Sequence, residues 1–265
     1  MSNQETAPVL LTREGGVAWL RMNRPAVLNA LDEGTAAAFR DACRDVAADP
    51  SVRALVIAGN GRGFMAGGDL ARFRADPDRG PDTAAIIIGA LHEALLILEG
   101  LHAPVVASVH GPVAGAGMSI ATAADLCIAA DDAKFTLAYA RIGATPDGSG
   151  TYHLPRLVGL RKAMELALLA DTIDAAEALR IGLVNRVVPA ASLAEETAAL
   201  AARLASGPTQ SYARIRRLLR QSWTATLAEQ LDAERDAFCA SAATEDFREG
   251  ITAFFEKRGA VFHGR

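Results

Sequence analysis

Hydrophobic and polar positions alternate along the chain in a way that predicts strands and helices in turn. The stretch "VLLTREGGVAWLRM" predicts two strands joined by a turn at Glu14-Gly15-Gly16. Nearly continuous apolar runs predict buried strands over 52–59 and 104–111, with a helix over 84–100 between them. Shorter strands are expected within 125–138. Strands alternating with helices to about residue 190 indicate parallel pairing through crossover helices, and therefore an α/β fold.

The spacing of apolar residues also predicts where helices lie. "DEGTAAAFRDACRDVAAD" predicts an amphipathic helix with Asp32 as its N-cap. Residues 191–257 have a helical period almost throughout, with breaks at Gly207-Pro208 and near Thr244. The segment "SYARIRRLLR" predicts an amphipathic surface helix with Ile215, Leu218 and Leu219 on its apolar face. We therefore expect an α/β core over residues 1–190 that carries the functional site, and a helical C-terminal region over 191–265.

Composition narrows the classes of function. With 51% hydrophobic and 22% charged residues, the 265-residue chain is of ordinary globular composition. A net charge of −4 favours neither nucleic-acid nor membrane partners. Three scattered cysteines without metal-ligand spacing predict no metal site and a reducing compartment. The N-terminus lacks a signal-peptide pattern, so a cytoplasmic protein is expected. His92, Glu93 and Glu99 interrupt the apolar run over 84–101, which favours a buried helix over a membrane span.

Two glycine-rich stretches carry the candidate chemistry. The first is "GNGRGFMAGGDL", residues 59–70, and the second is "SVHGPVAGAGMSIATAADL", residues 108–126. In the second, a strand ends near Gly111 and a helix begins near Ala116, which places free N–H groups at a helix N-terminus. A tight crossover would use the same glycines, whereas a dinucleotide fingerprint is disfavoured because Ile120 occupies its third glycine position. Two such loops could each aim one N–H at a developing oxyanion, a contact typically worth about 2.7–4 kcal/mol at a transition state.

Five ordered motifs identify a resemblance. "MNRPAVLNAL", "GRGFMAGGDL", "PVVASVHGPVAGAGMSIATAADL", "FTLAYARIGATPDGSGTYHLPRLVG" and "EALRIGLVNRVV" resemble, in this order, the signatures of the crotonase (enoyl-CoA hydratase/isomerase) superfamily. The fourth is similar to a loop of the ring-1,2-epoxyphenylacetyl-CoA isomerases. The resemblance implies a crotonase (ClpP-like) β-β-α spiral with a helical C-terminal trimerisation region, and a homotrimer or a dimer of trimers. It also implies an acyl-CoA thioester substrate, with coenzyme A as part of the substrate and no separate cofactor.

The resemblance also implies roles for individual residues. Backbone N–H groups of Gly68 and Ala116 would hold the thioester oxygen as an oxyanion hole. Asp69 alternatively caps a helix beginning at Leu70, which is the more favoured role for its side chain. Packing of Phe254 against Phe255 is the alternative to a coenzyme A contact by the C-terminal segment. The implied coenzyme A and substrate contacts are Ala26, Leu28, Ala66, Asp69, Leu70, Ala71, Phe255 and Lys257.

Departures from the family pattern decide the expected reaction. Hydratases of the family hold water between two glutamates, but this chain has Ser119 and Tyr139 at those positions. Because water activation needs a paired acid and base, ordinary hydration is not expected. The single carboxylate left is Asp147, which local sequence also favours as a turn residue or N-cap. Apolar walls such as Leu137 and Ile142 are expected to raise the pKa of Asp147 by desolvation.

Isomerisation of an unsaturated acyl-CoA by Asp147 is therefore the favoured function. A dehalogenase-type or other hydrolytic reaction, or hydration, would use Asp147 with His92, beside Tyr139. The aromatic cage of the dehalogenases is missing, and a backbone carbonyl is the more expected partner of the His92 ring. A non-catalytic protein that binds coenzyme A esters is a further alternative. Ser119, Tyr139 and His92 are expected to face the acyl group in any of these.

Overall fold

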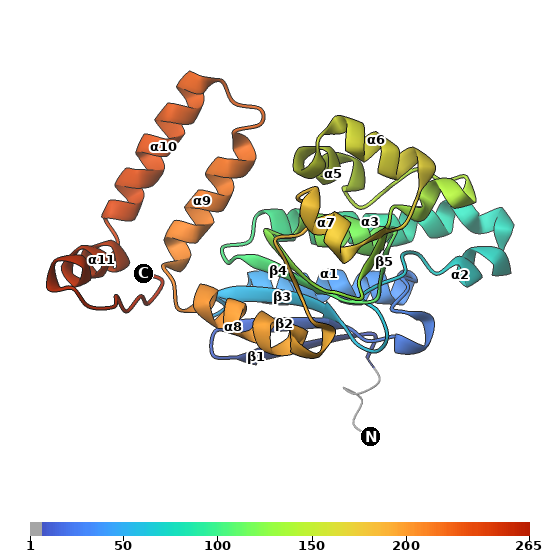
Figure 1. Ribbon diagram of the computed structural model, residues 1–265, viewed down its shortest axis with the longest axis horizontal. Helices are drawn as coiled ribbons and strands as arrows, with labels where there is room; N and C mark the ends of the chain where they lie inside the picture. Colours follow the sequence, from blue (N-terminus) through green and yellow to red (C-terminus); the bar gives the residue numbers. More distant parts are fainter. Residues whose placement is uncertain (1–6) are drawn as a thin grey trace.

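The computed structural model describes residues 7–265, which form two β-sheets surrounded by helices (Figure 1). The larger sheet has six strands in the order β1-β2-β3-β4-β6-β9, and the smaller has three in the order β5-β7-β8. The strands are β1 (Val9–Glu14), β2 (Val17–Met22), β3 (Ala54–Gly59), β4 (Val105–Val109), β5 (Pro112–Ala114), β6 (Leu126–Ala130), β7 (Lys134–Thr136), β8 (Ile173–Asp174) and β9 (Arg186–Val188).

Pairing in the larger sheet follows the sequence pattern. β1 and β2 are antiparallel around Gly15 and Gly16, whereas the pairs β2–β3, β3–β4, β4–β6 and β6–β9 are parallel. The parallel strands are buried on both faces, which is why β3 and β4 are almost entirely apolar. The predicted α/β class with parallel pairing is confirmed.

Helices connect the strands and then continue alone to the C-terminus. The described α-helices are α1 (Glu33–Ala47), α2 (Leu70–Ala75), α3 (Gly80–Glu99), α4 (Ala116–Ala123), α5 (Gly150–Val158), α6 (Leu160–Leu169), α7 (Ala175–Arg180), α8 (Leu193–Ala205), α9 (Thr209–Gln221), α10 (Leu227–Ala242) and α11 (Glu245–Glu256). Asp32 caps α1 as predicted, because its side chain accepts a hydrogen bond from the Thr35 N–H at 2.8 Å. Thr244 caps α11 at the predicted break, while the break between α9 and α10 was not predicted.

The apolar helix α3 is a core helix along one face. By length and composition it could cross a bilayer. Its residues Ile87, Leu91, Leu95 and Leu98 nevertheless belong to the main hydrophobic core, which also contains side chains of α1 and the larger sheet. Burying that face agrees with the buried helix expected from the sequence.

The C-terminal helices divide into two groups. α8 packs on the other face of the sheet, where Leu193, Ala201 and Ala205 join Val56 and Val106 in a second core. α9, α10 and α11 extend away from the sheets, at the left of Figure 1.

α9 is a surface helix, as the sequence predicts, but an arginine rather than its apolar face is buried against the core. Ile215 and Leu219 are exposed, while Arg216 is buried with its side chain only 8% accessible. The Arg216 guanidinium bonds to the Asp125 carboxylate at 2.6 Å and to the Leu98 carbonyl at 3.0 Å, so a cation attaches this helix to the core.

Candidate active site

The two glycine-rich stretches lie side by side. Isolated parallel bridges pair Met65 with Val113 and Leu31 with Gly68. The Met65 N–H donates to the Pro112 carbonyl at 3.1 Å, and the Ala114 N–H donates back to the Met65 carbonyl at 2.8 Å. The loop that contains Gly68 therefore lies between segment 24–32 on one side and segment 111–116 on the other.

Four of the five glycines in the first stretch have a structural reason. A Cβ at any of them would come within 3.4 Å of another residue's heavy atom: at Gly59, Phe64 O; at Gly61, Pro25 Cβ; at Gly63, Pro112 Cδ; and at Gly67, Ala114 O. Gly67 also has a φ of +102°, which L side chains rarely adopt. Gly68 is the exception, because a Cβ there would meet only the Phe73 ring, at 3.9 Å. No contact within the protein requires a glycine at position 68. The space beside this residue could therefore be used by a ligand.

The N–H groups of Gly68 and Ala116 are free. Leu31 donates to the Gly67 carbonyl and accepts from the Asp69 N–H, both at 2.8 Å, so the N–H of Gly68 between them points away from Leu31. Ala116 is the first residue of α4, where no intrahelical partner exists for an N–H. Within residues 7–265, neither N–H has a hydrogen-bond partner.

Tyr139 links these loops to Asp147. A Cβ built on Gly115 would lie 3.4 Å from Gly67 Cα and 3.9 Å from Tyr139 Cζ, so the two loops and the tyrosine ring are in contact. The Tyr139 hydroxyl donates to Asp147 Oδ1 at 2.5 Å. The three sequence-predicted elements, namely the two loops and the carboxylate, are therefore brought together in space.

The turn that contains Asp147 is fixed by Ser119. The buried Ser119 hydroxyl donates to the Asp147 carbonyl at 3.0 Å. A Cβ at Gly150 would lie 2.8 Å from Ser119 Oγ, so the turn packs directly on this small side chain. Asp147 is not the N-cap of the next helix: α5 begins at Gly150, and Ser149 precedes it in a left-handed conformation.

Burial raises the pKa of the Asp147 carboxyl above its usual range, and this outweighs the opposing effects of the Tyr139 hydrogen bond and the His92 charge. Desolvation by the surroundings was the predicted cause. Of the predicted walls, Leu137 is buried, whereas Ile142 is exposed. A carboxyl group whose pKa is raised by burial is suited to accept a proton near neutral pH.

His92 differs from its prediction. Its ring is exposed on α3 and has no hydrogen bond among the residues that the structure describes, so a backbone carbonyl is not its partner. Its charge nevertheless acts on Asp147. It lines a cleft between α3 and α5 together with Leu95, Leu96, Glu99, Ser149, Tyr152 and His153.

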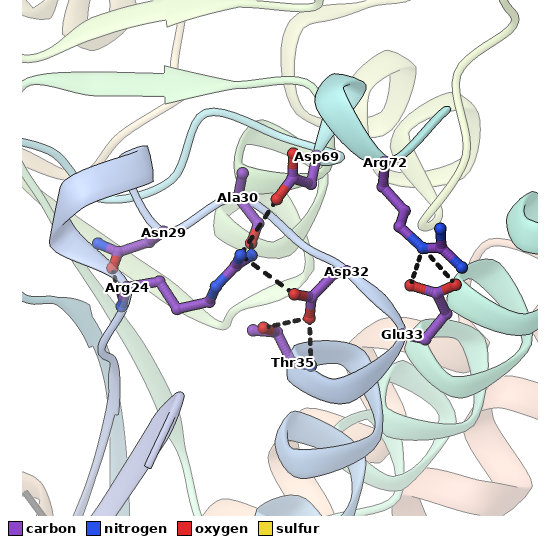
Figure 2. Close-up of polar contacts among 8 residues, drawn as sticks. All are labelled: Arg24, Asn29, Ala30, Asp32, Glu33, Thr35, Asp69 and Arg72. Atoms are coloured by element: carbon purple, nitrogen blue, oxygen red, sulfur yellow. Dashed lines mark hydrogen bonds and ion pairs between the residues drawn. The ribbon is translucent and has the colours of Figure 1, made fainter. Parts of the chain in front are cut away.

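Asp69 also has a different role from the one favoured by its sequence. α2 begins at Leu70 as predicted, but the Asp69 side chain forms no cap hydrogen bond in the described chain. It accepts instead from Arg24 Nη2 at 3.1 Å (Figure 2). The capping prediction is wrong because the Arg24 guanidinium, 45 positions earlier in the chain, binds the Asp69 carboxylate instead.

Asn29 and Arg24 are site-supporting residues that the sequence analysis missed. The buried Asn29 amide donates to the carbonyls of Asn60, Gly63 and Phe64 at 2.9–3.0 Å. No local signal in "NRPAVLN" reveals these contacts, which span more than thirty positions.

The residues proposed to contact coenzyme A fall into two groups. Leu28 and Ala66 are joined by a hydrogen bond from the Ala66 N–H to the Leu28 carbonyl at 2.9 Å. Exposed residues close to them in sequence are Ala26, in a short helical turn, and Leu70 and Ala71, at the start of α2. Phe255 and Lys257, at the end of α11, are exposed and lie far from these loops within one chain (Figure 1). Within residues 7–265, no group of three or more His, Cys, Asp or Glu side chains is placed to hold a metal ion.

Comparison with known proteins places this site in a family. The sequence model of a family described as enoyl-CoA hydratase/isomerase matches residues 12–265. The chain belongs to this family, within the crotonase superfamily. The family acts on acyl-CoA thioesters, so the chain is an acyl-CoA enzyme.

The relatives differ in the activity that their names give. The chain is 37% identical to 1,2-epoxyphenylacetyl-CoA isomerase of Escherichia coli K12, covering 95% of this chain and 97% of that one. It is 38% identical to crotonyl-CoA hydratase of Syntrophomonas wolfei, covering 96% and 97%. The crystal structure of an enoyl-CoA hydratase from Polaromonas sp. JS666 superimposes with a TM-score of 0.91 at 34% identity, covering 96% and 99%. The predicted crotonase-type fold is confirmed, while the names of the relatives leave the reaction open.

Proposed function

We propose that this enoyl-CoA hydratase/isomerase family member isomerises an unsaturated acyl-CoA through a thioester enolate. The observation that supports the proposal is a single carboxylate, Asp147, beside two loops with free N–H groups at Gly68 and Ala116. Ser119 and Tyr139 are at the positions where hydratases of the family hold their two glutamates. The Ser119 hydroxyl donates to the Asp147 main-chain carbonyl, and the Tyr139 hydroxyl donates to the Asp147 carboxylate.

The proposed reaction needs only these groups. The thioester oxygen accepts hydrogen bonds from the Gly68 and Ala116 N–H groups, Asp147 removes a proton from carbon 2, and the electrons move onto the held oxygen. Asp147 then returns the proton to carbon 4, so the double bond moves without net oxidation or added water. Each donor would contribute about 2.7–4 kcal/mol of transition-state stabilisation.

Exchange of the carbon 2 proton with deuterated water tests the proposal. Asp147→Asn should slow both exchange and isomerisation of a short 3-enoyl-CoA by about 10²–10⁴-fold, the usual contribution of a general base. Asp171→Asn, at an exposed position, is the matched control. Near-full exchange in Asp147→Asn would remove the carboxylate from the mechanism.

Hydration or hydrolysis is the second candidate, because the His92 charge acts on Asp147 and the two side chains could together handle water. Reaction in heavy-oxygen water separates the two candidates. An isomerase product contains no label, whereas a hydratase or hydrolase product contains it.

A further inference from the structure

The loop that presents Gly68 has few anchors of its own. Phe64 and Met65 are fully buried, but the next three residues, Ala66, Gly67 and Gly68, have at most a methyl group. The Gly68 peptide therefore takes its orientation from main-chain bonds to segment 28–31. These are Ala66 N–H to the Leu28 carbonyl, Leu31 N–H to the Gly67 carbonyl, and Asp69 N–H to the Leu31 carbonyl.

Segment 28–31 is itself in an unfavourable conformation. Leu28 and Asn29 have φ values of 51° and 59°, in the left-handed region that L side chains seldom adopt. Such a conformation persists only when neighbouring groups hold it in place. The Asn29 side chain does so from one side, since its Oδ1 accepts from the Arg24 N–H at 2.8 Å while its Nδ2 donates into the glycine loop.

Arg24 holds the segment from the other side. Its Nη1 donates to the Ala30 carbonyl at 2.6 Å, directly before the Leu31 peptide that holds Gly67 and Asp69. Its Nη2 lies 3.1 Å from both the Asp69 and the Asp32 carboxylates. Figure 2 shows the guanidinium between these three groups, which come from the segment before α1, the N-cap of α1 and the start of α2.

We propose that Arg24 is a positioning residue of this enzyme, which sets the direction of the Gly68 N–H through its ion pair with Asp69 and its bond to Ala30. Asp69, the residue after Gly68, is attached to Arg24 by its side chain and to Leu31 by its backbone N–H. Gly67, the residue before Gly68, is attached to Leu31 by its carbonyl, so both neighbours of Gly68 are held in place. Both carboxylates are partly shielded, with side-chain exposures of 16% for Asp69 and 29% for Asp32, which strengthens the contacts relative to a fully exposed pair.

This positioning role rests on the oxyanion role of Gly68 proposed above. Substituting Arg24 should have a large effect on the rate, although its side chain touches no substrate atom. A displacement of a catalytic group by about 1 Å can cost on the order of 100-fold in rate. Arg24→Gln should therefore lower kcat about 10- to 100-fold and change KM less, because the bond from Gly68 to the thioester oxygen strengthens in the transition state. Asp69→Asn should lower kcat in the same direction but by less, because Arg24 keeps its contacts with Ala30 and Asp32. The double variant should lose little more than Arg24→Gln alone, because the Asp69 carboxylate acts through Arg24.

Absorption of bound cinnamoyl-CoA supplies a readout that a purely structural role would not move. Its conjugated thioester absorbs at longer wavelength when its carbonyl oxygen accepts strong hydrogen bonds. The wild-type enzyme should shift this band to the red. At saturating ligand, Arg24→Gln should lose most of the shift and Asp69→Asn a smaller part of it. Arg72→Gln is the matched control, since it removes the neighbouring ion pair with Glu33 in Figure 2 and should leave the shift unchanged.

Each outcome of this experiment supports or overturns the proposal. A full red shift and an unchanged kcat in Arg24→Gln and Asp69→Asn would overturn the positioning role while leaving the oxyanion site intact. A shift lost equally in Arg72→Gln would also overturn it. If Arg24→Gln does not fold, Asp69→Asn decides alone, because it keeps a side chain of the same shape. A wild-type enzyme that produces no shift would overturn the proposed oxyanion hole itself, and the positioning role with it.

Discussion

Gly67 and Gly68 are adjacent, but the fold constrains them differently. Gly67 has a φ of +102° and touches the second glycine loop, whereas Gly68 has neither a left-handed backbone nor a close neighbour. Gly67 is needed to bring the two glycine-rich loops together. Gly68 keeps the space beside its own free N–H open.

Substituting each glycine with alanine should separate these roles. Gly67→Ala should destabilise the protein by about 1 kcal/mol or more, because an L side chain is strained at that φ. Gly68→Ala should change stability by less than about 0.5 kcal/mol but lower kcat/KM, because its methyl group enters the space proposed for the thioester. Urea unfolding and steady-state kinetics of both variants measure the two effects. Equal loss of stability in both would show that Gly68 is also a structural glycine.

The environment of Asp147 predicts how activity depends on pH. Burial raises its pKa, so the base becomes protonated at a higher pH than an exposed aspartate, and kcat/KM should fall as pH decreases through this raised value. The Tyr139 hydrogen bond favours the ionised form and lowers the pKa. Tyr139→Phe should therefore move the acid limb of the kcat/KM profile to higher pH.

Tyr212→Phe is the control for that profile, because Tyr212 lies on α9, away from Asp147. An acid limb that stays in place in Tyr139→Phe would show that the measured pKa belongs to a group other than Asp147.

At the scale of elements, the attachment of α9 depends on a buried charge. Arg216 bonds to the Asp125 carboxylate and to the carbonyls of Leu98 and Leu101. Arg220 adds a second contact to Asp125 at 2.8 Å. This helix therefore presents arginines to the core and its aliphatic side chains to the outside.

Arg216→Met should destabilise the protein by about 3–5 kcal/mol, because it leaves the shielded Asp125 carboxylate with one of its two cationic partners and removes the guanidinium donors from the Leu98 and Leu101 carbonyls. Arg217→Met, at the exposed next position, should change the free energy of unfolding by less than about 0.5 kcal/mol. Chemical denaturation followed by circular dichroism measures both. Similar stability of the two variants would contradict the anchoring role of Arg216.

At the scale of the whole molecule, α9–α11 expose many large apolar side chains. Phe254 and Phe255 are 76% and 77% exposed and stack only edge to face on each other, with ring centroids 5.6 Å apart. Others on these helices are Ile215, Leu219, Leu227, Leu231, Phe238 and Ile251. Apolar surface of this extent is typical of a protein–protein interface.

The homotrimer or dimer of trimers that the family resemblance implies stays a prediction, and this exposed apolar surface is where we propose its subunit contacts. Multi-angle light scattering should give a multiple of the 27.7 kDa chain mass, and Phe254→Glu with Phe255→Glu should reduce it. A wild-type monomer across a wide concentration range would contradict this expectation.

The sequence by itself determined the alternation of strands and helices, the cap of α1 and the two glycine loops, because periodicity, capping and glycine geometry are local properties. The role of Asp147 as the base stays a prediction, which rests on the resemblance of its contiguous motif to the family's. The sequence could not determine the direction of α9, the partner of Asp69 or the support that Asn29 gives to the loop. Those depend on which charges and carbonyls meet across separations of 31 to 118 positions. Only the tertiary structure decides such contacts, because the free energy of burying a charge depends on the partners that the fold brings to it.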